Sequence, residues 1–415
     1  MESFIRRLWL AIVTIAAFAG VTAMPSQTPL RNIMYLTGQH PIIPDLSHTF
    51  TVTHVVLAFM QSSFFNEDEP DPWWPLFMPV AAVRSRFRPR TKIMVAIGGW
   101  GDTKGFATAA RDEDSRQRFA KNVVKMVEAT GADGVDIDWE YPGGNGEDYK
   151  VISNFEKAWE AAAYPQLLAA LRRALGPSKL ISAAVPGILG DIRLAFTPDT
   201  VPAIMASVDF LNVMTYDLMN RRSTSTQHHT GIIGSMESLD EYLNAGAPPA
   251  KLNLGFAFYV KFFRVPHHNS HDHCVSRSLL EPFGSKIPGI GCPTGGMEDP
   301  GTGIDLGRTG GFSYHDAVPD EVARSFKRAL SEGVYDEWGG GYYFMDHDTE
   351  LPDALFWTFD TPDAIARKFP HVVESNKLGG VFAWGLGEDA PEFTHLKAVS
   401  DNVARINAGR VRDEL

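Results

Sequence analysis

Three acidic residues at alternate positions make residues 134–140 the most informative segment of this sequence. The segment reads Gly-Val-Asp-Ile-Asp-Trp-Glu, which places carboxyl groups at Asp136, Asp138 and Glu140. Because alternate residues of a strand face the same side, these three groups point together, away from the apolar residues between them. Neighbours on one face lie about 6.5–7 Å apart and repel one another, so we expect at least one to hold a proton at neutral pH. A carboxyl group that keeps its proton is what general acid catalysis requires.

Eight short apolar runs are available to position these groups. Each ends in Gly, Pro, Asp or an aromatic residue, and they cover residues 32–36, 52–59, 92–97, 134–139, 180–185, 210–215, 252–258 and 380–384. Segments with helical periodicity lie between several of them, for example residues 115–129 and 155–175. Strands that alternate with helices predict parallel βα units, and eight such units close into a (β/α)8 TIM barrel of the α/β class. The catalytic groups of such barrels stand at the C-terminal ends of the strands.

The interval between the last two predicted strands is too long for a single loop. Residues 261–358 are rich in Gly and Pro, contain both cysteines, and include a helical stretch at 319–331 and an aromatic cluster at 342–344. Because long structureless loops are uncommon inside compact domains, we predict a small α+β insertion subdomain between strands 7 and 8. The catalytic barrel as a whole is expected to cover residues 24–409.

The acidic segment resembles the DxxDxDxE signature of glycoside hydrolase family 18, the chitinases, with Asp133 as its first residue. The similarity extends from about residue 31 to residue 398. It implies that Glu140 protonates the glycosidic oxygen and that Asp138 holds the N–H of the substrate's 2-acetamido group. The family uses no second carboxylate as nucleophile. Instead, the acetamido oxygen attacks the anomeric carbon, forms an oxazolinium ion and leads to retention of configuration. Asp136 would share a proton with Asp138, while Asp133, which has the other parity along the strand, is expected to be structural.

A second segment carries the same resemblance. Residues 214–217 read Met-Thr-Tyr-Asp at the end of the sixth predicted strand and are similar to the MxYD segment of the family. The resemblance implies that Tyr216 donates its hydroxyl to the acetamido carbonyl, that Asp217 binds sugar hydroxyls, and that Met214 packs beneath the sugar ring. Standing alone, a Tyr-Asp pair at a strand end is more often a turn than a site.

Aromatic residues near other strand ends complete the predicted substrate site. Trp384 matches the tryptophan that forms the floor of the family's cleavage subsite, and its place at the end of the eighth strand favours a stacking platform over core packing. Trp100 directly follows two glycines and resembles a platform for the sugar on the leaving side. The other residues expected to contact the substrate or to support the acid are Tyr35, Phe59, Tyr141 and Tyr259.

The sequence departs from the family pattern in three places. We call the three alternating carboxyl groups of Asp136, Asp138 and Glu140 the acidic ladder. In the family the third strand usually ends in SxGG, whose serine stabilises the innermost aspartate of this ladder, but this chain has Ala96 there. We therefore expect the proton-sharing step to depend more on Tyr35, or the pH optimum to shift. Lys261 stands where the family usually has an arginine, which weakens the inference that the family's arginine contact is present in this chain. Arg221 and Arg222 lie in the sixth loop, where a basic side chain could bind sugar hydroxyls.

Two groups of histidines invite a metal-site interpretation. Residues 267–273 read His-His-Asn-Ser-His-Asp-His, and His228 is followed by His229. Both groups are better explained as solvated loops, because the family chemistry needs no metal and no pattern of residues that would orient metal ligands is visible. We therefore expect neither a metal nor a cofactor.

The overall charge argues against negatively charged binding partners. The 415 residues carry a formal net charge of −12 at pH 7, whereas nucleic-acid backbones and anionic membranes are bound by basic surfaces. Neither is expected as a partner. A neutral substrate fits better, and we expect a monomer that binds chitin or N-acetylglucosamine oligosaccharides.

The two ends of the sequence carry features of the secretory pathway. Residues 1–23 contain two arginines, an apolar run and a Val-Thr-Ala cleavage site, which predicts a signal peptide. In that oxidising compartment the two cysteines of the chain, Cys274 and Cys292, are expected to form a disulfide. The tail at residues 410–415 ends in Arg-Asp-Glu-Leu, which resembles the retrieval signals of the endoplasmic reticulum. Secretion and retention in that compartment both stay open.

Three functions are compatible with this sequence. The first is a retaining chitinase with the insertion forming one wall of a deep cleft; Trp139, Pro142, the MxYD match and Trp384 favour it. The second is an endo-β-N-acetylglucosaminidase that cuts the core of N-glycans, which an endoplasmic reticulum address would suit. The third is a catalytically inactive chitin-binding lectin, and the presence of Glu140 argues against it.

Overall fold

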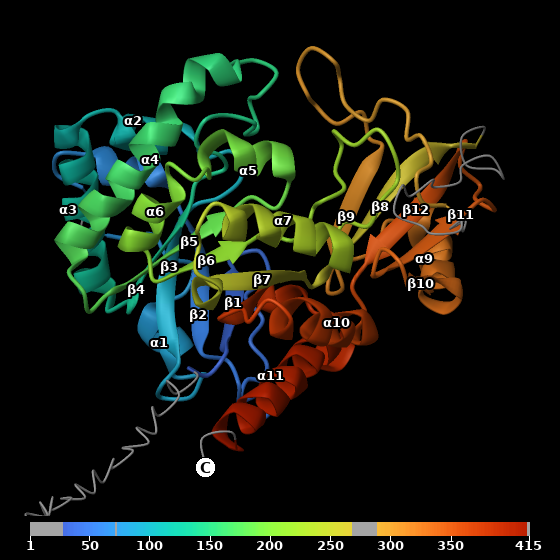
Figure 1. Ribbon diagram of the computed structural model, residues 1–415. Coiled ribbons are helices and arrows are strands. Elements are labelled where there is room, and N and C mark those ends of the chain that lie inside the picture. The colour runs from blue at the N-terminus through green and yellow to red at the C-terminus, as the bar shows by residue number, and fades with distance from the viewer. Residues whose placement is uncertain (1–27, 71–72, 268–288, 413–415) are drawn as a thin grey trace, which may run out of the picture.

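A closed barrel of eight parallel strands forms the centre of the protein (Figure 1). This computed structural model describes residues 28–70, 73–267 and 289–412. Around the barrel the strands follow the order β1, β13, β7, β6, β5, β4, β3 and β2, and all neighbours are parallel. The predicted (β/α)8 architecture is thus confirmed. The barrel strands are β1 Arg31–Thr37, β2 His54–Met60, β3 Lys92–Gly98, β4 Gly134–Asp138, β5 Leu180–Val185, β6 Phe210–Val213, β7 Leu252–Ala257 and β13 Gly380–Trp384.

Helices surround the barrel and cover the apolar faces of its strands (Figure 1). They are α1 Val80–Arg84, α2 Lys104–Ala110, α3 Glu113–Thr130, α4 Asn154–Leu175, α5 Leu189–Ala195, α6 Val201–Ser207, α7 Ile232–Asn244, α10 Pro362–Lys368 and α11 Thr394–Arg412. Helix α3 begins where the Asp112 carboxylate accepts a hydrogen bond from the Ser115 backbone N–H at 2.8 Å. It ends at Gly131, whose φ of 72° is a left-handed conformation that glycine adopts without strain. None of the helices in the described part of the chain is long and apolar enough to cross a membrane.

Trp139 fixes the direction in which the acidic ladder faces. Its indole is 1% exposed and stacks on Phe106 of α2, with ring centroids 5.4 Å apart. Because the side-chain period of a strand is two, a slip of one residue in β4 would bury the carboxylates among the helices and turn the indole into the barrel. The large area that Trp139 buries therefore holds the alternate residues of β4 inside the barrel.

The predicted insertion forms a second sheet beside the barrel (Figure 1). Five strands pair in the order β10, β11, β12, β8 and β9, and every pairing is antiparallel. They are β8 Tyr259–Pro266, β9 Thr309–Ser313, β10 Val334–Asp336, β11 Gly341–Asp346 and β12 Asp353–Phe359. Helix α9 (Asp320–Glu332) packs on this sheet through a separate apolar cluster centred on Trp357. Since β8 starts two residues after β7 ends, the sheet rises from the C-terminal end of the barrel, where the catalytic groups were predicted.

Several predictions concern segments outside the described residues. They are the signal peptide at 1–23, Cys274 with its disulfide to Cys292, most of the histidine-rich segment 267–273, and the last three residues of the chain. These remain predictions.

Candidate active site

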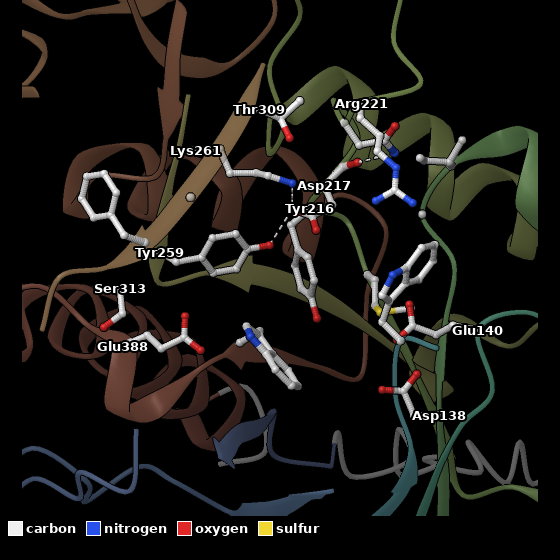
Figure 2. Close-up of a pocket in the computed structure, with 18 of the residues that line it drawn as sticks. Asp138, Glu140, Tyr216, Asp217, Arg221, Tyr259, Lys261, Thr309, Ser313 and Glu388 are labelled. Atoms are coloured by element: carbon white, nitrogen blue, oxygen red, sulfur yellow. Dashed lines mark hydrogen bonds and ion pairs between the residues drawn. The ribbon is translucent and has the colours of Figure 1, made fainter. Parts of the chain in front are cut away.

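A cavity of about 540 Å³ opens at the C-terminal ends of the barrel strands. Its wall comes from both parts of the fold: Glu140 follows β4, Tyr216 follows β6, Trp384 ends β13, and Lys261 belongs to the insertion strand β8. Figure 2 shows the labelled side chains facing one common space. The insertion thus forms one side of the cavity.

The acidic ladder is deeply buried, as its apolar neighbours predicted. Asp136 is fully buried inside the barrel, and Asp138 and Glu140 are 2% and 9% exposed. Burial raises the pKa of Asp136 to about 6 and that of Glu140 to about 7. The pKa of Asp138 lies well above its ordinary value, first because of burial and then because Glu140 and Asp136 repel its charge. Loss of solvent thus contributes more than the mutual repulsion expected from spacing.

Asp138 differs from Asp136 in its hydrogen bonding. Asp136 accepts hydrogen bonds from the Tyr35 hydroxyl at 2.7 Å and from the Ser182 hydroxyl at 2.5 Å. Oδ1 of Asp138, by contrast, is buried without a hydrogen-bond partner among the described residues. Since buried polar atoms are normally paired, this oxygen is free to accept a hydrogen bond from a bound molecule.

Tyr216 and Asp217 lie on the far side of the cavity from the ladder. In Figure 2 the Tyr216 hydroxyl points across the space toward the side that holds Asp138 and Glu140. The Asp217 carboxylate accepts a hydrogen bond from the Tyr259 hydroxyl at 2.7 Å and pairs with Lys261 Nζ at 2.8 Å. Burial, the largest single influence, would raise the pKa of Asp217, but Lys261 and His229 together outweigh it and hold that pKa below its usual range.

Lys261 lies in the insertion as predicted, whereas the place of Tyr259 differs from the one expected. Lys261, which stands in place of an arginine, lines the cavity and forms an ion pair. Tyr259 was expected to end the seventh barrel strand; instead β7 stops at Ala257 and Tyr259 is the first residue of β8. The chain turns there because it leaves the barrel to enter the insertion sheet.

Aromatic side chains form the floor of the cavity. Trp384 lines it and stacks on Phe59, with ring centroids 5.4 Å apart and planes 23° from parallel. Tyr35 lies beneath the same indole at 5.6 Å, so this tyrosine supports both the ladder and the floor. Met214, 9% exposed, also lines the cavity.

Beyond Glu140 the cavity continues between Trp100 and Tyr141. Their rings meet edge to face with centroids 6.3 Å apart, and Trp100 is 45% exposed. Arg221 reaches over the Trp100 ring, with its Cζ 5.9 Å from the centroid. Every residue predicted for the site except Tyr35 and Asp136 therefore lines this single cavity, and those two lie directly beneath it.

The expectation of solvated loops is wrong for His228 and His229. His228 is 9% exposed and its Nε2 lies 2.8 Å from Asp336 Oδ2, while His229 is fully buried with Nδ1 3.7 Å from Asp217 Oδ1. The insertion sheet covers both rings, and the sequence gives no local sign of that cover. Burial lowers the pKa of His229, so it is neutral at pH 7 and contributes packing and polarity rather than charge.

The comparison with known proteins agrees with this geometry. The model of "Glycosyl hydrolases family 18" matches residues 31–389, which include the whole ladder, the Tyr-Asp pair and Trp384. The chain belongs to glycosyl hydrolase family 18. The retaining and substrate-assisted mechanism is general in that family.

Individual relatives of this family 18 chain are distant. It is 25% identical over 382 residues to Nod factor hydrolase protein 1 of Medicago truncatula, covering 89% of this chain and 88% of that protein. It is 25% identical over 323 residues to Endochitinase 1 of Metarhizium robertsii, covering 75% and 65%. A solved chitinase from Rhizomucor miehei superposes with a TM-score of 0.67 at 21% identity, over 90% of this chain and 99% of the other. The last likeness concerns the fold alone.

Ser182 is a functional residue of this family 18 site that the motifs did not reveal. Strand pairing aligns Ala96 of β3, Asp136 of β4 and Ser182 of β5 on one level, so the serine faces the aspartate from the side opposite the alanine. Ser182 of β5 thus supplies the hydroxyl that Ala96 of β3 lacks. The sequence-based expectation named only a greater dependence on Tyr35 and did not include this serine. A polar residue inside an apolar strand was the available signal, because unpaired polar groups are rarely buried.

Asn212 and Glu388 are further residues that the motifs missed. Asn212 of β6 donates to the Tyr35 hydroxyl at 2.9 Å and extends the polar layer under the cavity. Glu388 lines the cavity beyond Trp384, near His40 and Asp316, and burial raises its pKa to about 7. Neither residue belongs to a motif, and only the closure of the barrel brings them to the site.

Proposed function

We propose that this protein is a retaining glycoside hydrolase that cleaves β-1,4-linked N-acetylglucosamine polymers, chitin and its oligosaccharides, by substrate-assisted catalysis. The observation that carries the proposal is one cavity in which Asp138 and Glu140 face the Tyr216 hydroxyl. Trp384 lines the same cavity. These groups supply an acid, an acceptor for an amide N–H, a donor for an amide carbonyl and a surface for a sugar ring. An N-acetylated sugar has a feature to match each of them.

The first chemical step breaks the glycosidic bond. Because burial raises the pKa of Glu140 to about 7, a large share of this group holds a proton at neutral pH and can donate it to the glycosidic oxygen. The acetamido carbonyl oxygen attacks the anomeric carbon as the leaving sugar departs with that proton. Asp138, whose Oδ1 has no partner among the described residues, accepts the amide N–H and stabilises the positive charge of the oxazolinium ion. The Tyr216 hydroxyl aligns the carbonyl by donating to it.

The second step reverses the proton transfer. The Glu140 carboxylate takes a proton from water, which attacks the anomeric carbon and opens the oxazolinium ring. Two inversions at this carbon leave the product in the β configuration. The deeper Asp136 shares a proton with Asp138, and the hydroxyls of Tyr35 and Ser182 stabilise its charged form.

The relatives support the choice of an N-acetylglucosamine polymer. One is called an endochitinase and another a Nod factor hydrolase. An endo-β-N-acetylglucosaminidase acting on N-glycans is the second candidate, favoured by the Arg-Asp-Glu-Leu end of the sequence. A lectin is disfavoured, because a protonated, buried Glu140 serves no purpose in binding alone.

One chromatographic experiment separates the candidates. Purified protein is incubated with chito-oligosaccharides and, separately, with a high-mannose glycopeptide, and the products are resolved by size. We expect shortened chito-oligosaccharides and an intact glycopeptide. Cleavage of the glycopeptide alone would favour the second candidate, and binding without cleavage of either substrate would favour a lectin. Glu140→Gln serves as the inactive control in each reaction.

We also propose that the protein enters the secretory pathway, where it is either secreted or retained in the endoplasmic reticulum by its last four residues. If the tail retains the protein, removing residues 412–415 from the expressed chain should move it into the culture medium. Equal secretion of the full chain would show that the tail is not a retrieval signal.

A further inference from the structure

The side of the cavity that receives the departing sugar is set by the position of the acid. In the proposed function, on which this inference rests, the sugar that reacts lies over Trp384 between Asp138 and Tyr216. The sugar that leaves must then lie beyond Glu140, where the cavity continues along Trp100. The exposed indole can stack on a sugar ring, but stacking alone does not distinguish one substituted sugar from another.

Arg221 is the basic side chain whose hydrogen-bonding capacity is unused at this end. Arg222 is held by the Asp191 carboxylate at 3.0 Å, and Lys261 by Asp217 at 2.8 Å. Arg221 lines the cavity, and neither of its terminal nitrogens donates a hydrogen bond to another residue in the described part of the chain. Figure 2 shows its guanidinium group turned into the cavity. A guanidinium carries five N–H donors and no acceptor, so its ligand must offer acceptor atoms.

The insertion holds this guanidinium in place. Nε of Arg221 lies 3.7 Å from Oε2 of Glu298, which is close enough for an ion pair but too far for a hydrogen bond. The Glu298 side chain is 14% exposed, accepts a hydrogen bond from the Tyr149 hydroxyl and lies 3.5 Å from Lys150 Nζ. One carboxylate from the insertion therefore joins the loop after β4 to the loop after β6. This arrangement fixes Arg221 against Trp100 without using its outer N–H groups.

We propose that Arg221, positioned by Glu298, is a specificity-determining residue that selects an N-acetylated sugar on the leaving side of the cleavage point. The acetamido carbonyl and the hydroxyls of N-acetylglucosamine are acceptors for its free N–H groups. A deacetylated glucosamine has an ammonium group instead, which offers no acceptor and is repelled by the guanidinium. The face of Trp100 provides apolar area for stacking on the sugar ring, and the charge of Arg221 provides the selectivity for the acetylated sugar.

Kinetics on two substrates test the binding role. An aryl β-chitobioside places no sugar beyond Glu140, whereas chitopentaose does. Arg221→Ala should raise KM for chitopentaose about tenfold and change kcat/KM for the aryl substrate less than about twofold. Arg221→Gln, which keeps an N–H donor, should show a smaller rise. Arg324→Ala, an exposed arginine on α9, is the matched control and should leave both substrates unaffected.

Partially deacetylated chitin tests the selection itself. After digestion, the non-reducing ends of new fragments report which sugar occupied the leaving side. Wild-type protein should enrich acetylated ends, and both Arg221 variants should lose that enrichment. An unchanged KM for chitopentaose in Arg221→Ala, or no enrichment in the wild type, would overturn the inference while leaving the proposed function intact. If the wild type cleaves neither chitopentaose nor the aryl substrate, the proposed function fails instead.

Discussion

Replacing Ser182 with alanine should move the acidic limb of the pH–rate profile to higher pH. The Ser182 hydroxyl donates to Asp136 Oδ1 at 2.5 Å, inside the barrel where water does not replace it. A hydrogen bond to a charged group is worth about 1.5–3 kcal/mol, and one pKa unit corresponds to about 1.4 kcal/mol. Tyr35 still donates to Asp136, so we expect the pKa of Asp136 to rise by about one unit, from about 6 in the native protein.

The direction of the effect follows from the proposed proton sharing. Asp136 must be charged for its proton to reside on Asp138, and a higher pKa keeps Asp136 protonated until a higher pH is reached. The acidic limb of kcat/KM should therefore shift upward by about one unit. The upper limb belongs to Glu140, whose pKa is about 7, and it should stay in place. The variant should consequently have a narrower profile rather than a uniformly lower one.

The measurement is kcat/KM against pH with an aryl chitobioside. Ser331→Ala, an exposed serine on α9, is the matched control. The double variant Ser182→Ala with Ala96→Ser should recover the native limb, because position 96 faces Asp136 from the other neighbouring strand. A limb that does not move, or moves to lower pH, would refute the reasoning. A loss of rate equal at every pH would assign Ser182 to packing only.

The same substitution should also lower the free energy of unfolding, and the loss should grow as the pH rises. The folded-state pKa of Asp136 lies above its ordinary value of 3.8, so ionisation of this group destabilises the fold as pH rises through that window. Removing Ser182 should lower the free energy of unfolding by about 1.4 kcal/mol at about pH 8, and by much less at about pH 4. Urea denaturation at the two pH values measures the difference.

Three further predictions concern the acid, the amide acceptor and the cysteines. Glu140→Gln should lower kcat at least about a hundredfold while oligosaccharide binding persists, which calorimetry can check; near-native activity would sink the assignment. A thiazoline analogue of the cyclic intermediate should inhibit the native protein, and Asp138→Ala should reduce both turnover and thiazoline affinity; equal inhibition of both proteins would separate Asp138 from the intermediate. Titration of the native protein should find no reactive thiol if Cys274 and Cys292 are paired, and two reactive thiols would exclude the disulfide.

The barrel and the ladder could be predicted because both depend on local periodicity. Residues 134–140 alternate in polarity with period two. This local pattern alone predicts that Asp138 and Glu140 face the same side of the strand, without knowledge of the neighbouring strands. Trp139 then stabilises that facing by burial against α2. The insertion was predictable for a different reason, since the distance along the chain between two barrel strands was too great for a loop.

What could not be predicted depends on contacts between distant elements. Ser182 supports Asp136 only because β5 pairs with β4 in one particular register. His229 is buried because the insertion sheet closes over it. Arg221 and Glu298 meet between the loop after β6 and the insertion, and no period or motif in either segment encodes their approach. Such residues become visible only when the strands are closed into the barrel.

Proton NMR of the freshly formed product tests the central claim most directly. The claim is that the acetamido oxygen of the substrate is the nucleophile, with Glu140 as acid and Asp138 holding the amide. Spectra taken before mutarotation should show the new reducing end in the β configuration, because attack by the acetamido oxygen and then by water inverts the anomeric carbon twice. An α product appearing first would mean a single inversion by water. Asp138 would then have to act as a general base, and the substrate-assisted mechanism would be wrong.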